Sequence, residues 1–72
     1  VERTESKEGV SFEVKGKRIQ QIVVMSDLLN RSARMRVYDV LEKMGIMREI
    51  RKLEGNPGDE IKIGESSLEF PG

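Results

Sequence analysis

The sequence predicts an α+β domain in which a four-stranded, mainly antiparallel sheet carries three helices on one face, in the order β-β-α-α-α-β-β. Apolar and polar residues alternate near both ends of the chain, as in strands with one buried face. Between them, apolar residues recur every three or four positions, which is the helical spacing. Strands at the ends and helices in the middle are typical of the α+β class. We therefore expect one hairpin at each end.

The first hairpin is predicted over residues 1–16. Residues 1–5 form a weakly apolar outer strand, and the turn follows at Ser6–Gly9, where Gly9 supplies the conformational freedom that hairpin turns need. Residues 10–14 then alternate between apolar and polar side chains, which indicates a half-buried strand. The segment Lys15-Gly16-Lys17 breaks this pattern and ends the hairpin.

The segment from Arg18 to Leu29 can be interpreted in two ways. Its apolar side chains are spaced by three and four residues, which favours a short helix, whereas the β-branched run Ile22–Val24 favours a strand. We predict the helix. Ser26 and Asp27 should end it, because their side chains hydrogen-bond readily to nearby backbone groups.

Two further helices are predicted on either side of Gly45. Asn30 is a favourable N-cap for the first, and Gly45 is the expected left-handed terminator. The second should run for about ten residues until Gly55 and Pro57 stop it. The apolar stripes of the two helices are Ala33, Val37, Val40, Leu41 and Met44, followed by Ile46, Met47, Ile50 and Leu53.

The closing hairpin begins after a turn at Pro57-Gly58-Asp59. Alternation at Ile61 and Ile63 predicts one strand, residues 64–67 the turn, and Leu68 to Phe70 the last strand. Pro71 ends the pairing. We expect the Asp59 carboxylate to accept backbone N–H bonds in its turn, which is a structural role.

Composition excludes several classes of function. A chain of 72 residues makes one domain, and without cysteine or histidine it has no disulfide, no ordinary zinc site and no histidine-dependent catalysis. Thirteen basic and thirteen acidic residues cancel, so the net charge gives no strong attraction to nucleic acid or membranes. The longest apolar run, Ile22–Met25, is too short to cross a bilayer. We also find no glycine-rich phosphate-binding loop.

Several short motifs occur in a specific order along the chain. They are Phe12-Glu13-Val14-Lys15-Gly16, Met25-Ser26-Asp27, Asn30, Leu41-Glu42-Lys43-Met44-Gly45 with Ile46 after it, Gly58-Asp59-Glu60-Ile61-Lys62-Ile63-Gly64, and Leu68-Glu69-Phe70. In this order and spacing they resemble the C-terminal domain of the Obg family of GTPases, over residues 10–70. The chain departs from that family in three places. Arg31 and Ser32 replace an acidic first helical turn, Glu54 replaces a glycine, and Ser66-Ser67 replace an aromatic residue.

The resemblance implies that residues 1–72 are a single domain cut from a longer protein, behind a glycine-rich domain and a GTPase domain. It implies a non-catalytic accessory role in large-subunit ribosome assembly or stress control, in the cytoplasm. The partners would be the parent GTPase domain and the ribosomal large subunit or stress-response proteins, with no membrane. This domain would bind no cofactor, whereas the parent would use GTP and Mg²⁺.

The candidate contact residues are the helix arginines Arg31, Arg34, Arg48 and Arg51, which form two pairs three residues apart. Guanidinium groups suit phosphate, so a stand-alone RNA-binding module is one alternative function. A plain solvated helix face is the other interpretation of these arginines. An engineered sequence on this scaffold, with no selected function, is a further alternative that the departures at Arg31 and Ser66-Ser67 would fit.

Two other groups of residues are interpreted structurally. Asp39 and Glu42 share a helix face, where Arg36 and Lys43 make surface charge a better interpretation than an acid–base pair. Among the methionines, Met44 and Met47 lie in the apolar stripes and are expected to fill the core. Met35 falls off its stripe, where it would mark a protein contact if exposed.

Overall fold

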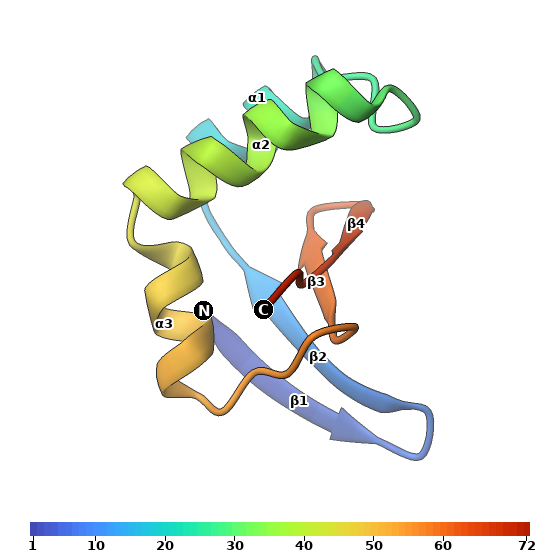
Figure 1. The fold of residues 1–72 in the computed structure, drawn as a ribbon, viewed down its shortest axis with the longest axis vertical. Helices are drawn as coiled ribbons and strands as arrows, with labels where there is room; N and C mark the ends of the chain where they lie inside the picture. The colour runs from blue at the N-terminus through green and yellow to red at the C-terminus, as the bar shows by residue number, and fades with distance from the viewer.

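The structure is a four-stranded sheet with three helices packed on one face. The computed structural model describes all 72 residues. In chain order its elements are β1 (Glu2–Ser6), β2 (Gly9–Val14), α1 (Lys17–Val24), α2 (Arg31–Lys43), α3 (Ile46–Lys52), β3 (Glu60–Ile63) and β4 (Ser66–Glu69). Figure 1 shows α2 and α3 joined by a short turn and running in different directions beside the sheet. The α+β class and the predicted order of elements are therefore confirmed.

The sheet is mixed, which corrects the predicted sheet at its centre: two of the three strand pairings are antiparallel, and the middle one is parallel. Its strand order is β1-β2-β3-β4, in which the two hairpins are antiparallel but the inner strands β2 and β3 run parallel, with Phe12 opposite Ile61. Parallel neighbours need a long crossover connection, which residues 15–59 and their three helices provide. The alternation of residues within each hairpin carries no information on how the two hairpins meet. That pairing is decided by the path of the helices.

The core lies between one face of this sheet and the three helices. Pairing aligns Phe12, Ile61 and Leu68 across three strands on the covered face, while Glu13, Lys62 and Ser67 on the other face are exposed. All thirteen buried residues are apolar, and none is polar or charged. They are Phe12, Val14, Ile19, Val23, Val37, Leu41, Ile46, Met47, Ile50, Ile61, Ile63, Leu68 and Phe70.

Residues 17–24 form a helix, as predicted, in spite of their β-branched run. Ile19 and Val23, one turn apart, are both buried, so packing of one helical face outweighs strand propensity here. The Ser26 hydroxyl donates to the carbonyl of Ile22 at 2.7 Å, and the Asp27 carboxylate accepts the N–H of Leu29 at 3.1 Å. This pair ends α1, as expected.

Both ends of α2 follow the predicted capping. The Asn30 side chain accepts hydrogen bonds from the N–H groups of Ser32 and Ala33, at 2.9 and 3.3 Å. At the other end, Gly45 has a φ of 79° and its N–H donates to the carbonyl of Glu42. Glycine reaches this left-handed conformation without steric cost, so the helix ends cleanly.

The end of α3 has the same geometry with a different residue. The N–H of Glu54 donates to the carbonyl of Arg51 and the N–H of Gly55 to that of Ile50, which is the Schellman pattern. Glu54 occupies its left-handed position with a φ of 66°, and it is the only non-glycine residue with positive φ. The glycine expected from the Obg resemblance at this position would suit the backbone better than glutamate does.

Glu54→Gly is therefore expected to stabilise the domain by about 1 kcal/mol, since a side chain costs roughly that much in the left-handed region. Urea unfolding followed by circular dichroism at 222 nm measures the change. Glu54→Ala is the matched control, because it removes the charge but keeps a Cβ, and its stability should stay near that of the unsubstituted chain. Equal gains in both variants would show that the charge, not the backbone, is responsible.

Candidate functional site

The four candidate arginines are exposed but lie in two separate places. Arg31 and Arg34 belong to the first turns of α2, and Arg48 and Arg51 belong to α3. Figure 1 shows that α3 follows the C-terminal end of α2, so the first turns of α2 lie at the opposite end of that helix, away from α3. The fold therefore does not gather the two pairs into one basic patch.

The four arginines also differ in whether their side chains interact with neighbouring groups. Arg51 pairs with the Glu42 carboxylate at 3.2 Å and so ties α3 to α2. The other three, Arg31, Arg34 and Arg48, make no ion pair. Arg34 is one helical turn before Tyr38 and its charge acts on that phenol. Arg31 and Arg48 are therefore the two arginines of the set with neither an ion pair nor an effect on Tyr38.

Tyr38 makes a long-range contact that sequence reasoning missed. Its hydroxyl donates to the backbone carbonyl of Glu69 on the outer strand β4 at 2.5 Å, which joins α2 to the edge of the sheet. Burial raises the pKa of Tyr38 above its ordinary 10.0, the charge of Glu69 adds to this, and the charge of Arg34 opposes it. The only signal of Tyr38 in the sequence was its place beside Val37 in the apolar stripe of this helix.

The raised pKa of Tyr38 makes stability depend on pH. Near pH 10 and above, the unfolded chain releases the phenolic proton first, so the free energy of unfolding falls as pH rises through the folded pKa. Tyr38→Phe should remove this slope and cost about 0.5–1 kcal/mol at pH 7 through the lost hydrogen bond. Since Tyr38 is the only tyrosine and there is no tryptophan, absorbance at 295 nm titrates it directly. A titration midpoint at or below 10 would contradict the prediction.

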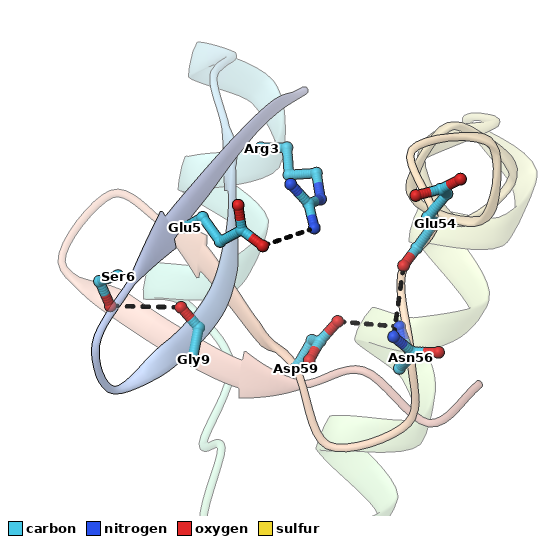
Figure 2. A network of polar contacts seen from close by, with 7 residues as sticks. All are labelled: Arg3, Glu5, Ser6, Gly9, Glu54, Asn56 and Asp59. Atoms are coloured by element: carbon cyan, nitrogen blue, oxygen red, sulfur yellow. Dashed lines mark hydrogen bonds and ion pairs between the residues drawn. The ribbon is translucent and has the colours of Figure 1, made fainter.

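The acidic candidates are all occupied by structural partners. Asp39 pairs with Lys43 at 3.0 Å and Glu42 with Arg51, which agrees with their interpretation as surface charge. The Asp59 carboxylate accepts the N–H of Asn56 at 2.8 Å, as Figure 2 shows, which confirms its predicted role in the turn. No group of three or more His, Cys, Asp or Glu residues could hold a metal ion. Asp39 and Glu42 thus belong to surface ion pairs, and Asp59 belongs to the turn before β3.

The side chains drawn in Figure 2 make hydrogen bonds to residues that are close to them in the sequence. The Asn56 side chain donates to the carbonyl of Glu54, the Arg3 guanidinium contacts the Glu5 carboxylate at 3.4 Å, and the Ser6 hydroxyl donates to the carbonyl of Gly9. All of these bonds span three residues or fewer, so they shape the β1–β2 turn and the loop before β3. They do not assemble a site.

The largest hollow on the surface, about 540 Å³, lies where α1 and its following loop meet the β3–β4 turn. We call it the α1 groove; its apolar lining is Val23, Val24, Leu28 and Ile63, and Glu65 is its only charged lining residue. Sequence reasoning did not identify it. The signal was present in the run Ile22–Met25, which holds more apolar residues than one face of a short helix can bury.

The methionines divide differently from their prediction. Met47 is buried, as expected, but Met44 is 49% exposed, so its placement in the core is wrong. Met44 is the C-cap of α2, one residue beyond the end of the helix at Lys43. Met35 is 61% exposed on α2 as a single apolar side chain, which is ordinary on a protein surface, so its exposure alone does not mark a contact. In addition, no helix is long and apolar enough to span a membrane.

Residues 1–70 match a protein family described as a domain of unknown function, DUF1967. This chain belongs to the DUF1967 family. DUF1967 is the C-terminal domain of Obg GTPases, so the resemblance inferred from the motifs is confirmed. The match extends over the whole sheet and all three helices, including β1, which the motifs did not cover.

Several similar proteins are named GTPase Obg. The protein from Lactobacillus delbrueckii subsp. bulgaricus (strain ATCC BAA-365 / Lb-18) is 36% identical over 59 residues, which is 82% of this DUF1967 chain and 13% of the relative. Those from Chloroflexus aggregans and Desulforudis audaxviator are 34% and 31% identical over 65 residues, or 90% of this chain and 15% of each relative. The chain thus spans about a seventh of their length. No solved structure matches it.

Proposed function

We propose that this chain is a non-catalytic accessory domain of a longer Obg GTPase, the parent protein, and acts through protein contacts. Its parent would bind GTP and Mg²⁺ in a separate GTPase region, in the cytoplasm, and would use this domain in large-subunit assembly or stress control. The observation that carries the proposal is the match over residues 1–70 to a domain that fills only 13–15% of proteins named GTPase Obg.

The side chains of the domain support an accessory role. Each acidic candidate is engaged by a neighbour: Asp39 by Lys43, Glu42 by Arg51, and Asp59 by a backbone N–H. The chain also has no histidine or cysteine and no phosphate-binding loop. What it offers instead is a fixed outer surface, and such a surface can bias another domain only by binding its states unequally.

The test compares the parent protein with and without residues 1–72. The affinity for GTP and the affinity for GDP should each differ by about fivefold or more between the two forms. A fivefold change is the lower end of the usual coupling between two sites. The 72-residue chain alone should hydrolyse no GTP above the buffer rate. Identical nucleotide affinities and identical co-sedimentation with the large ribosomal subunit in both forms would refute the proposal.

A stand-alone RNA-binding module is the second candidate, and the unpaired guanidinium groups of Arg31, Arg34 and Arg48 favour it. Their separation on two helices and the zero net charge weaken it. If it holds, affinity for ribosomal RNA should fall steeply with salt, and replacing one contacting arginine by glutamine should reduce the salt slope by about one. Arg51→Gln is the matched control, because Arg51 is already paired with Glu42.

A further inference from the structure

Three of the most exposed apolar side chains in the structure come from six consecutive residues. Val24, Met25 and Leu29 are 79%, 85% and 95% exposed, more than any other large apolar residue of the chain. They stand at the end of α1 and in its connection to α2. Single exposed apolar residues are ordinary on protein surfaces, whereas contact sites are found where several of them are grouped.

The backbone that presents these side chains is held by its own hydrogen bonds. The Ser26 hydroxyl is bonded to the carbonyl of Ile22, and the Asp27 carboxylate to the N–H of Leu29. The N–H of Asn30 donates to the carbonyl of Asp27 at 2.9 Å, which closes the turn directly before the α2 cap. Leu29 is therefore fixed outward by a turn of defined geometry, and its exposure is built into the connection.

The α1 groove lies directly beside this cluster and shares Val24 with it. The groove is apolar along Val23, Leu28 and Ile63, and its single charged lining residue is Glu65. Asp27, in the adjacent turn, is also acidic and exposed. Neither Lys nor Arg lines the groove. An occupant should accordingly offer aliphatic side chains to the groove and a basic side chain to Glu65.

We infer that the α1 groove and the exposed cluster Val24, Met25 and Leu29 are the docking site for an apolar, basic-flanked segment of the parent's GTPase region. This inference rests on the proposed function and adds the contacting surface to it. The relatives are about seven times longer than their match to this chain, so the domain is tethered to a much larger protein in them. Tethering gives an effective concentration of millimolar order, so a small apolar contact is enough.

A second copy of the chain fits the surface less well. Stable association of separate molecules usually buries more than about 1,000 Å² with good complementarity. Here the apolar surface consists of the four apolar side chains that line the groove, together with Met25 and Leu29 beside it, and an identical copy would bring the same acidic Glu65 to it. An intramolecular contact has no such area requirement, and a GTPase region can supply the opposite charge.

Thiol protection tests the docking site directly. The chain contains no cysteine, so Leu29→Cys and the control Met35→Cys each place a single thiol in this domain. Both positions are exposed, at 95% and 61%, so both variants should fold, which circular dichroism verifies. The alkylation rate by iodoacetamide is measured by peptide mass spectrometry in the 72-residue chain and in the whole parent, with GDP and with a non-hydrolysable GTP analogue.

Docking predicts that the thiol of L29C reacts about tenfold more slowly in the parent than in the chain alone, in at least one nucleotide state. The thiol of M35C should react equally fast in both proteins. Adding Glu65→Lys to L29C in the parent should restore most of the rate, because it reverses the charge that the segment meets. Equal rates for L29C, equal slowing of both thiols, or slowing of M35C alone would each overturn the inference.

This result is separable from the proposed function. If deleting the domain changes nucleotide affinity while L29C remains unprotected, the accessory role stands and only the docking site is wrong. If L29C is protected but deletion changes neither nucleotide affinity nor ribosome binding, the contact stands and the accessory role is wrong.

Discussion

Replacing Phe12 by alanine is expected to lower the free energy of unfolding by about 3–5 kcal/mol, because Phe12 is fully buried on an inner strand. Its side chain stands in the row that joins β2, β3 and β4, with Ile61 opposite. A 72-residue domain has only about 4–11 kcal/mol to lose. The variant should therefore lose between about a quarter and all of the stability of the domain.

Urea unfolding followed by circular dichroism measures the loss, and Phe12→Leu is the matched control. Leucine keeps an apolar side chain of similar size in the same position, so this variant should retain most of the stability. Ser11→Ala, on the polar face of the same strand, should change stability by less than about 0.5 kcal/mol. A Phe12→Ala variant that unfolds at the same urea concentration as the unsubstituted 72-residue chain would contradict the packing described here.

Gly55→Ala is expected to cost about 2–3 kcal/mol for lack of space rather than through backbone strain. A Cβ on Gly55 would lie 2.5 Å from Cγ2 of Ile50, 2.9 Å from the carbonyl oxygen of Ile50 and 3.2 Å from Cε2 of Phe70. The Ile50 carbonyl cannot move away, because it accepts the N–H of Gly55 in the α3 cap. The methyl group must therefore displace the cap or Phe70.

Two comparisons separate space from strain in this prediction. At Gly45, with a φ of 79°, an added Cβ would meet nothing within 4 Å, so Gly45→Ala should cost only about 1 kcal/mol of strain. Combining Gly55→Ala with Ile50→Leu removes the contact with Cγ2 but leaves the carbonyl contact, so stability should recover only in part. Equal losses for Gly45→Ala and Gly55→Ala, measured by urea unfolding, would refute the crowding at Gly55.

The elements of this fold were predictable because each depends on a few neighbouring residues. Asn30 and Gly45 delimit α2 through bonds to adjacent backbone groups, and alternation within each hairpin sets its buried face. The turn between β3 and β4 is shorter than predicted, because Ser66 and Ser67 join the strand. Pairing of β2 with β3 was not predictable in this way, since it joins residues about fifty positions apart.

The candidate site was predicted less well than the fold. The arginines were chosen from spacing within each helix, which gives a shared face but not the distance between α2 and α3. Tyr38 and the α1 groove depend on contacts between helices and the two ends of the last hairpin, at Glu69 and Glu65. Those contacts exist only once the whole sheet has formed, so local patterns do not contain them.

The parallel pairing of β2 and β3 also bears on how the chain reaches its folded state. Each hairpin and each helix can form locally within microseconds, but joining the two hairpins closes a loop that holds all three helices. Closure of so long a loop loses chain entropy before the core at Phe12 and Ile61 compensates for it. The zipping together of these two inner strands is therefore expected to be the slow, cooperative step of folding, and neither hairpin should persist without the other.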